Sequence, residues 1–80
     1  MKNIFENAYF GKPYKTSEDV VALYLGEDIG DFKYRLAYPI ISDITNKTSY
    51  IILQCDENGC SKCDIDVISE WQEETNIVFK

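Results

Sequence analysis

The stretch Asp31-Phe-Lys-Tyr-Arg-Leu-Ala-Tyr38 decides the fold class. Large apolar side chains alternate along it with charged or small ones, Phe32, Tyr34, Leu36 and Tyr38 against Lys33, Arg35 and Ala37. Successive side chains of a β-strand point to opposite faces, so this period of two predicts a strand over residues 31–38 with one face in the core. We expect three of the four large side chains to be buried. Pro39, which has no N–H, is expected to end the strand.

The neighbouring segments predict further short strands. Residues 20–25 form a continuous apolar run, and we expect a strand that is apolar on both faces. Residues 50–55 predict another strand, and residues 13–16 a short one that begins at Pro13. Residues 40–48 mix isoleucine with serine, aspartate, asparagine and threonine, and they predict an irregular loop.

Two turns and the two ends of the chain complete the pattern. Ser17-Glu-Asp19 predicts a turn, and Asn58-Gly59 predicts a second one because both residue types tolerate positive φ. Residues 64–74 fit either a strand or a helix, and their β-branched residues favour the strand. The N-terminal segment has the apolar spacing of one short helical turn, at Ile4, Phe5, Ala8 and Tyr9.

Together these elements predict a mainly β fold in a single small domain over residues 1–80. About five short strands separated by turns favour a small antiparallel barrel or a strongly bent sheet, since both arrangements limit the exposed edges.

The composition supports one folded domain and limits its partners. The chain has 80 residues, of which 45% are hydrophobic and 14% aromatic, so it can build a core and is not an acidic disordered tail. Its net charge of −6 and pI near 4.4 disfavour direct binding to nucleic acid, which needs clustered lysine and arginine. We expect no membrane span, because no apolar stretch is long enough, and no secretory signal in residues 1–15, and therefore a cytoplasmic protein.

Three cysteines and the lack of histidine limit the chemistry. Cys55, Cys60 and Cys63 have the spacing C-x4-C-x2-C, whereas structural zinc sites use four nitrogen or sulfur ligands. We therefore expect ordinary reduced thiols and no cofactor, with a metal site or a redox pair as the alternative. Without histidine, Ser-His and Cys-His nucleophiles are excluded, and no glycine-rich phosphate loop occurs, so we expect no enzyme.

Two motifs resemble a known group of sequences. Asn7-Ala-Tyr-Phe-Gly-Lys-Pro-Tyr-Lys-Thr16 resembles an opening N-A-x-F-G-x-x-[FY]-x-T, and Asp66-Val-Ile-Ser-Glu-Trp71 resembles a closing D-[IV]-[IV]-S-E-W. In this order they resemble small uncharacterised proteins of gut anaerobic bacteria that are associated with phage or mobile elements. The resemblance implies a β-rich, SH3-like fold and no known activity, substrate or catalytic residue. The cysteine cluster is not part of that group's pattern.

A surplus of aromatic side chains favours a non-enzymatic protein-interaction module. Six tyrosines, four phenylalanines and one tryptophan exceed what so small a core must bury, and tyrosine and tryptophan are favoured at interfaces. SH3-like barrels bind extended peptides in aromatic-lined grooves with acidic rims, and by this analogy we expect such a groove. The candidate residues are Tyr9, Tyr14 and Trp71 beside Glu70 and Glu73. Trp71 either closes the core or forms an exposed anchor.

Two alternative functions stay open. Acidic residues gather near the C-terminus, at Asp64, Asp66, Glu70, Glu73 and Glu74. They form either a solubilising surface or a patch for a basic partner, and the first alternative is an acidic inhibitor that mimics nucleic acid on such a partner. The second is the metal or redox module of the cysteines. The sequence identifies no protein partner, and we expect a monomer or a weak two-fold dimer that covers a sheet edge.

Overall fold

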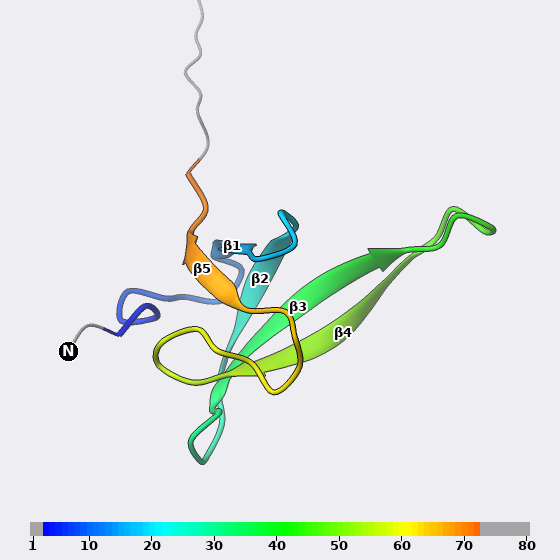
Figure 1. Cartoon of the computed structure of the whole chain (residues 1–80). Coiled ribbons are helices and arrows are strands. Elements are labelled where there is room, and N and C mark those ends of the chain that lie inside the picture. Colours follow the sequence, from blue (N-terminus) through cyan, green and yellow to red (C-terminus); the bar gives the residue numbers. More distant parts are fainter. Residues whose placement is uncertain (1–2, 73–80) are drawn as a thin grey trace, which may run out of the picture.

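Five antiparallel strands form a single sheet in the order β4-β3-β2-β1-β5 (Figure 1). The computed structural model describes residues 3–72. The strands are β1 (Pro13–Thr16), β2 (Val21–Glu27), β3 (Tyr34–Ile41), β4 (Thr48–Cys55) and β5 (Val67–Glu70). The mainly β prediction is therefore confirmed, and so are the predicted strands around β1, β2, β4 and β5.

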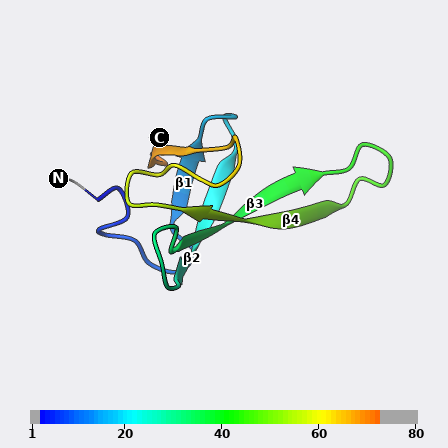
Figure 2. The ribbon, with the colours of Figure 1, turned by 60° about the horizontal axis from the view of Figure 1, so that its bottom comes forward.

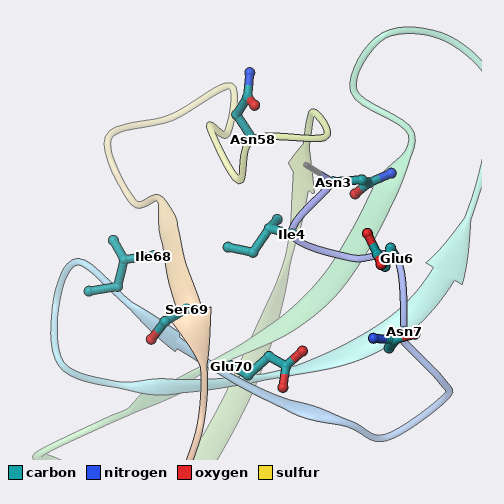
Figure 3. A pocket seen from close by; sticks show the side chains of 8 residues that line it. All are labelled: Asn3, Ile4, Glu6, Asn7, Asn58, Ile68, Ser69 and Glu70. Carbon is teal, nitrogen blue, oxygen red and sulfur yellow. The ribbon is translucent and has the colours of Figure 1, made fainter. Parts of the chain in front are cut away.

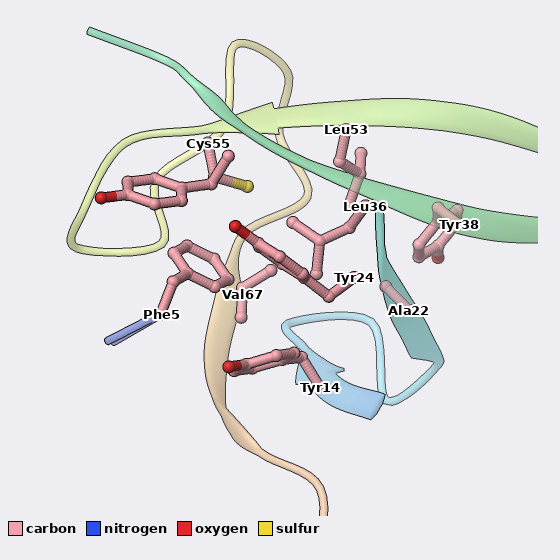
Figure 4. Packing of buried hydrophobic residues seen from close by; sticks show 10 residues of the cluster. Phe5, Tyr14, Ala22, Tyr24, Leu36, Tyr38, Leu53, Cys55 and Val67 are labelled. Carbon is pink, nitrogen blue, oxygen red and sulfur yellow. The ribbon is translucent and has the colours of Figure 1, made fainter. Parts of the chain in front are cut away.

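One face of the sheet, which we call the inner face, carries the core (Figure 4). Tyr34, Leu36 and Tyr38 of β3 are buried there, while Phe32 lies before the strand and is only half-buried. The prediction of three buried side chains out of four is therefore confirmed. The other strands contribute Tyr14, Thr16, Ala22, Tyr24, Leu53, Cys55 and Val67.

The N-terminal segment covers the inner face through Phe5. The Phe5 ring lies 5.1 Å from the Tyr14 ring, 5.8 Å from the Tyr24 ring and 4.8 Å from the Tyr34 ring, between ring centroids. Such offset and tilted aromatic contacts add to the stabilisation that comes from buried area. The expected helical turn is not a helix: Glu6 and Ala8 donate backbone hydrogen bonds to Asn3 and Phe5, which makes consecutive turns.

The prediction that Pro39 ends its strand is wrong, because β3 continues to Ile41. β2 pairs with β3 only as far as the Leu23–Ala37 pair, whereas β4 pairs with β3 along its whole length. The Pro39 nitrogen faces the side where β2 has ended, so the ladder loses no hydrogen bond there. The loop expected over residues 40–48 is accordingly shorter, and it spans residues 42–47 between the two strands.

The sheet is bent but open, so the closed-barrel alternative is wrong. β4 and β5 are its two edges and do not pair with each other. Cys55 of β4 and Val67 of β5 nevertheless lie in the same core, and the connection between them folds back on both strands. Cys55 forms an isolated bridge with Ser61, and the Val67 N–H donates to the Gly59 carbonyl at 2.8 Å.

The last described segment shows why its periodicity was ambiguous. β5 is a strand, but Val67 lies opposite Thr16 and Ser69 lies opposite Lys15, so Ile68 is an extra residue in a bulge. A bulge reverses the alternation of side chains that follow it. Among residues 3–72 we find no helix long and apolar enough to cross a bilayer.

Candidate interaction surface

The outer face of the sheet carries a row of apolar residues that crosses β1 to β4 and continues to Trp71, just beyond the end of β5. Pro13 lies opposite Leu23, Leu23 opposite Ala37, and Ala37 opposite Ile52. The row extends to Trp71, whose N–H donates to the Pro13 carbonyl at 3.2 Å and continues the β1–β5 pairing. Directly opposed residues of antiparallel strands point to the same side, and alternation from Glu70, which lies opposite buried Tyr14, puts Trp71 on the outer face.

A second group of apolar residues continues this row onto the arm formed by β3 and β4, which projects from the rest of the sheet (Figure 2). Pro39 lies opposite Tyr50, and Ile41 lies opposite Thr48. These side chains share the face of Ala37 and Ile52 because they are two and four positions further along the strands. We define the outer apolar face by Pro13, Leu23, Ala37, Pro39, Ile41, Tyr50, Ile52 and Trp71.

The outer apolar face is open to solvent over much of its area. Tyr50 is 59% exposed and Ile52 51%, while Leu23 on β2 and Trp71 beyond the end of β5 are 39% and 38% exposed. Large exposed apolar side chains that lie opposite one another on neighbouring strands form the kind of contiguous patch that marks an interaction site. The prediction that Trp71 closes the core is not met, since alternation turns its side chain away from the inner face.

Two basic residues lie at the ends of this face, and each is paired with a carboxylate. Lys15 and Arg35 lie on the outer face at its two ends, Lys15 opposite Val21 and Arg35 opposite Gln54. The Lys15 ammonium lies 3.6 Å from the Asp19 carboxylate, and the Arg35 guanidinium lies 3.4 Å from that of Asp28. Such exposed ion pairs are weak and exchange readily.

The residues predicted for the groove do not lie together on this face. Tyr14 is fully buried in the inner core, because β1 is paired on both sides and Tyr14 points inward, so its prediction as a groove residue is wrong. Glu70 lies on the inner side, and its carboxylate is 3.2 Å from the Lys12 ammonium. Tyr9 is 62% exposed and lies under the same ammonium, 5.6 Å from ring centroid to nitrogen. Glu73 lies outside the described residues.

The inner side does contain a groove, between the N-terminal segment and β5 (Figure 3). It has a volume of about 420 Å³ and is lined by Asn3, Ile4, Glu6, Asn7, Asn58, Ile68, Ser69 and Glu70. These residues provide three amides, two carboxylates, one hydroxyl and two isoleucine side chains. The groove is therefore a second candidate binding surface.

The three cysteines are divided between the core and the surface. Cys55 is buried, and burial raises the pKa of its thiol to about 12, helped by the nearby Asp66 and Asp56 carboxylates. Cys60 and Cys63 are exposed, and all three thiols are free. Within residues 3–72 no three histidine, cysteine or acidic side chains are arranged to hold a metal ion.

Sequence reasoning missed most of the outer apolar face. The alternation predicted the side chains of β3 that point into the core, and the remaining aromatic residues were interpreted as a groove. A usable signal was present in the continuous apolar run Tyr50-Ile-Ile-Leu53, since a strand with one solvated face normally alternates.

Comparisons with known protein families, with curated proteins and with solved structures found no match to the chain.

Proposed function

We propose that the chain is a non-enzymatic protein-interaction module that binds its partner through the outer apolar face. The observation that supports this most is the uninterrupted apolar row from Trp71 to Ile52, which lies on the side of the sheet away from the core. A sheet of this kind normally has one packed face and one polar, solvated face. Here the second face is apolar at its centre and charged at its rim, as protein interfaces are.

The residue types of this face suit a binding role. Tyrosine and tryptophan are enriched among the side chains that contribute most to binding, because they bury a large area and lose few rotamers. Tyr50 and Trp71 lie towards opposite edges of the sheet, with aliphatic side chains between them. A partner that spans both would cover Leu23, Ala37 and Ile52 as well.

The compartment that we propose is the cytoplasm. Free thiols at Cys55, Cys60 and Cys63 agree with a reducing environment. The resemblance of the two motifs implies no activity, so the proposed function rests on the geometry alone. Most carboxylates of the described residues are spread over several separate turns and connections, which gives the acidic-inhibitor alternative no comparable support.

The test is an affinity capture that compares three single variants, each with an exposed aliphatic residue replaced by lysine. Leu23→Lys changes the outer apolar face, Ile68→Lys changes the groove beside β5, and Ile29→Lys changes the exposed loop between β2 and β3. Circular dichroism first establishes that each variant is folded. Proteins retained from a lysate of the source organism are then quantified by mass spectrometry.

The proposal predicts at least one protein that is retained by the wild type and by Ile29→Lys and Ile68→Lys, but is depleted about tenfold or more with Leu23→Lys. A buried lysine without a partner costs more than the 1.4 kcal/mol that corresponds to a tenfold change in affinity. Equal retention by Leu23→Lys and the wild type, or depletion only with Ile68→Lys, would reject the outer apolar face as the binding surface.

A further inference from the structure

The free edge of β4 is unusually suited to pair with another strand. β4 is eight residues long, has no charged residue and no proline, and pairs with β3 without a bulge. Natural proteins usually protect an edge strand from pairing with another chain by a charged side chain, a proline, a bulge or a short strand length. β5, at the opposite edge, is short and bulged and carries Glu70.

The direction of the backbone groups along this edge follows from one hydrogen bond. The Lys62 N–H donates to the Gln54 carbonyl at 3.3 Å, and Lys62 lies on the side of β4 away from β3. In an antiparallel strand every second residue directs both its N–H and its C=O to the same side. Ile52, Tyr50 and Thr48 therefore direct their backbone groups outward, and no described strand pairs with them.

The arm that contains this edge also has no third strand beside it within the described residues. Beyond Ala37, β3 has no neighbour except β4, so residues 38–41 and 48–51 form a two-stranded ribbon. An isolated two-stranded ribbon is marginally stable in water, and three or more strands are needed for independent stability. A further strand on β4 would supply the third.

We propose that two copies of the chain form a two-fold dimer by antiparallel pairing of their β4 edges, with the axis at Tyr50. This register places Tyr50 opposite Tyr50 of the second copy and Thr48 opposite Ile52, so all three outward-facing residues find partners. An axis at Ile51 would place Thr48 opposite Gln54, whose carbonyl is already bound by Lys62. The proposal concerns the edge of β4 and goes beyond the outer apolar face, so either can fail alone.

Charge favours a second copy as the occupant of this edge. Along residues 48–52 no charged side chain is present, so two copies meet there without like-charge repulsion, although each has a net charge of −6. The register also places Lys47 of each copy opposite Leu53 of the other. Leu53 lies three residues before the connection over residues 56–66. This connection carries one lysine, Lys62, and four acidic residues, which are Asp56, Glu57, Asp64 and Asp66.

The first test measures mass in solution by sedimentation velocity over a range of concentrations. We expect the wild type to approach twice its 9.3 kDa mass as the concentration rises. Tyr50→Pro removes an outward N–H at the axis while keeping the ladder to β3, and we expect it to remain a monomer. Ile29→Lys is the matched control and should dimerise as the wild type does. A wild type that stays monomeric, or a Tyr50→Pro variant that dimerises equally well, overturns the proposal.

The second test reads the register and does not depend on Tyr50→Pro being folded. In a Cys60→Ser, Cys63→Ser background, which keeps the buried Cys55, one exposed cysteine is introduced by Tyr50→Cys or Ile51→Cys and oxidised with glutathione. Opposed residues of a hydrogen-bonded antiparallel pair have Cα atoms about 5.5 Å apart, within the range of a disulfide. We expect a covalent dimer from Tyr50→Cys and much less from Ile51→Cys. The reverse order, or equal low yields, contradicts an axis at Tyr50.

Discussion

Tyr14 combines complete burial with an unsatisfied hydroxyl. Its side chain is among the largest that are fully buried, and the hydroxyl has no hydrogen-bond partner among the described residues. Burial, helped by the carboxylate of Glu70, raises the pKa of Tyr14 to about 12. The ring is thus needed for packing against Phe5, whereas the oxygen contributes nothing visible.

We therefore predict that Tyr14→Phe increases the free energy of unfolding by about 1 kcal/mol, because a buried polar group without a partner is removed. Thr16→Val is the matched control, since the buried Thr16 hydroxyl donates to the Val20 carbonyl at 2.7 Å. The free energy of unfolding of Thr16→Val should be about 1 kcal/mol lower than that of the wild type. Urea unfolding measures both, and a Tyr14→Phe variant that is less stable than the wild type would show that the hydroxyl has a partner.

The same groups set the behaviour of the protein in alkali. The ordinary pKa is 10.0 for Tyr14 and 9.0 for Cys55, and burial raises each to about 12 in the folded chain. Between these values the unfolded chain loses protons that the folded chain keeps, so the free energy of unfolding is fully retained below about pH 9 and falls as the pH rises towards 12. Tyr14→Phe should make that fall shallower in urea titrations, whereas an unchanged slope would contradict it.

The thiols should differ in reactivity, because the thiolate is the reactive form. At pH 8 we expect iodoacetamide to modify exposed Cys60 and Cys63, and to modify buried Cys55 only after unfolding in urea. Mass spectrometry of the intact chain counts the adducts, and peptide mapping locates them. Rapid modification of Cys55 in the folded chain would mean that the end of β4 opens readily.

At the scale of elements, the connection between β4 and β5 depends on Gly59. Its φ is +89°, and a Cβ atom there would collide with the Val67 carbonyl oxygen. The Gly59 carbonyl also accepts the N–H of Val67. The turn, the start of β5 and the packing of Val67 are therefore fixed together.

Gly59→Ala should lower the free energy of unfolding by more than about 2 kcal/mol, since it adds a backbone collision to the strain of positive φ. Gly11→Ala is the matched control, because Gly11 has the same φ of +89° and nothing within 4 Å of a Cβ. We expect it to cost only the conformational strain, about 1–2 kcal/mol. Equal losses in thermal unfolding would show that the contact with Val67 is relieved at no cost.

The elements also show how far sequence reasoning reaches. The alternation that identified β3 and the Asn-Gly turn before Cys60 are local signals, so both were predictable. The bulge at Ile68 is not local, because it arises from pairing with β1, and it alone decides that Trp71 lies on the outer face. Likewise, Pro39 is tolerated within β3 only because β2 ends beside it.

At the scale of the whole molecule, the sheet has one packed face and one apolar face without a covering layer in residues 3–72. The inner face is closed by Phe5 and the N-terminal segment. The candidate site could not be predicted because it consists of the outward halves of several strands, which become neighbours only through the strand order and register. The protein-interaction role that we propose depends on this outer apolar face being the surface that a partner covers.

Hydroxyl-radical footprinting of the free chain and of its captured complex tests this dependence most directly, because it reports the solvent contact of individual side chains. At one chain concentration, we predict that labelling of Trp71 and Tyr50 falls on complex formation while labelling of Tyr9 and Ile68 is unchanged. Trp71 separates partner binding from β4 pairing, since it lies at the other edge of the sheet. Protection of Tyr9 and Ile68 with unchanged labelling of Trp71 would contradict the account and move the binding surface to the groove beside β5.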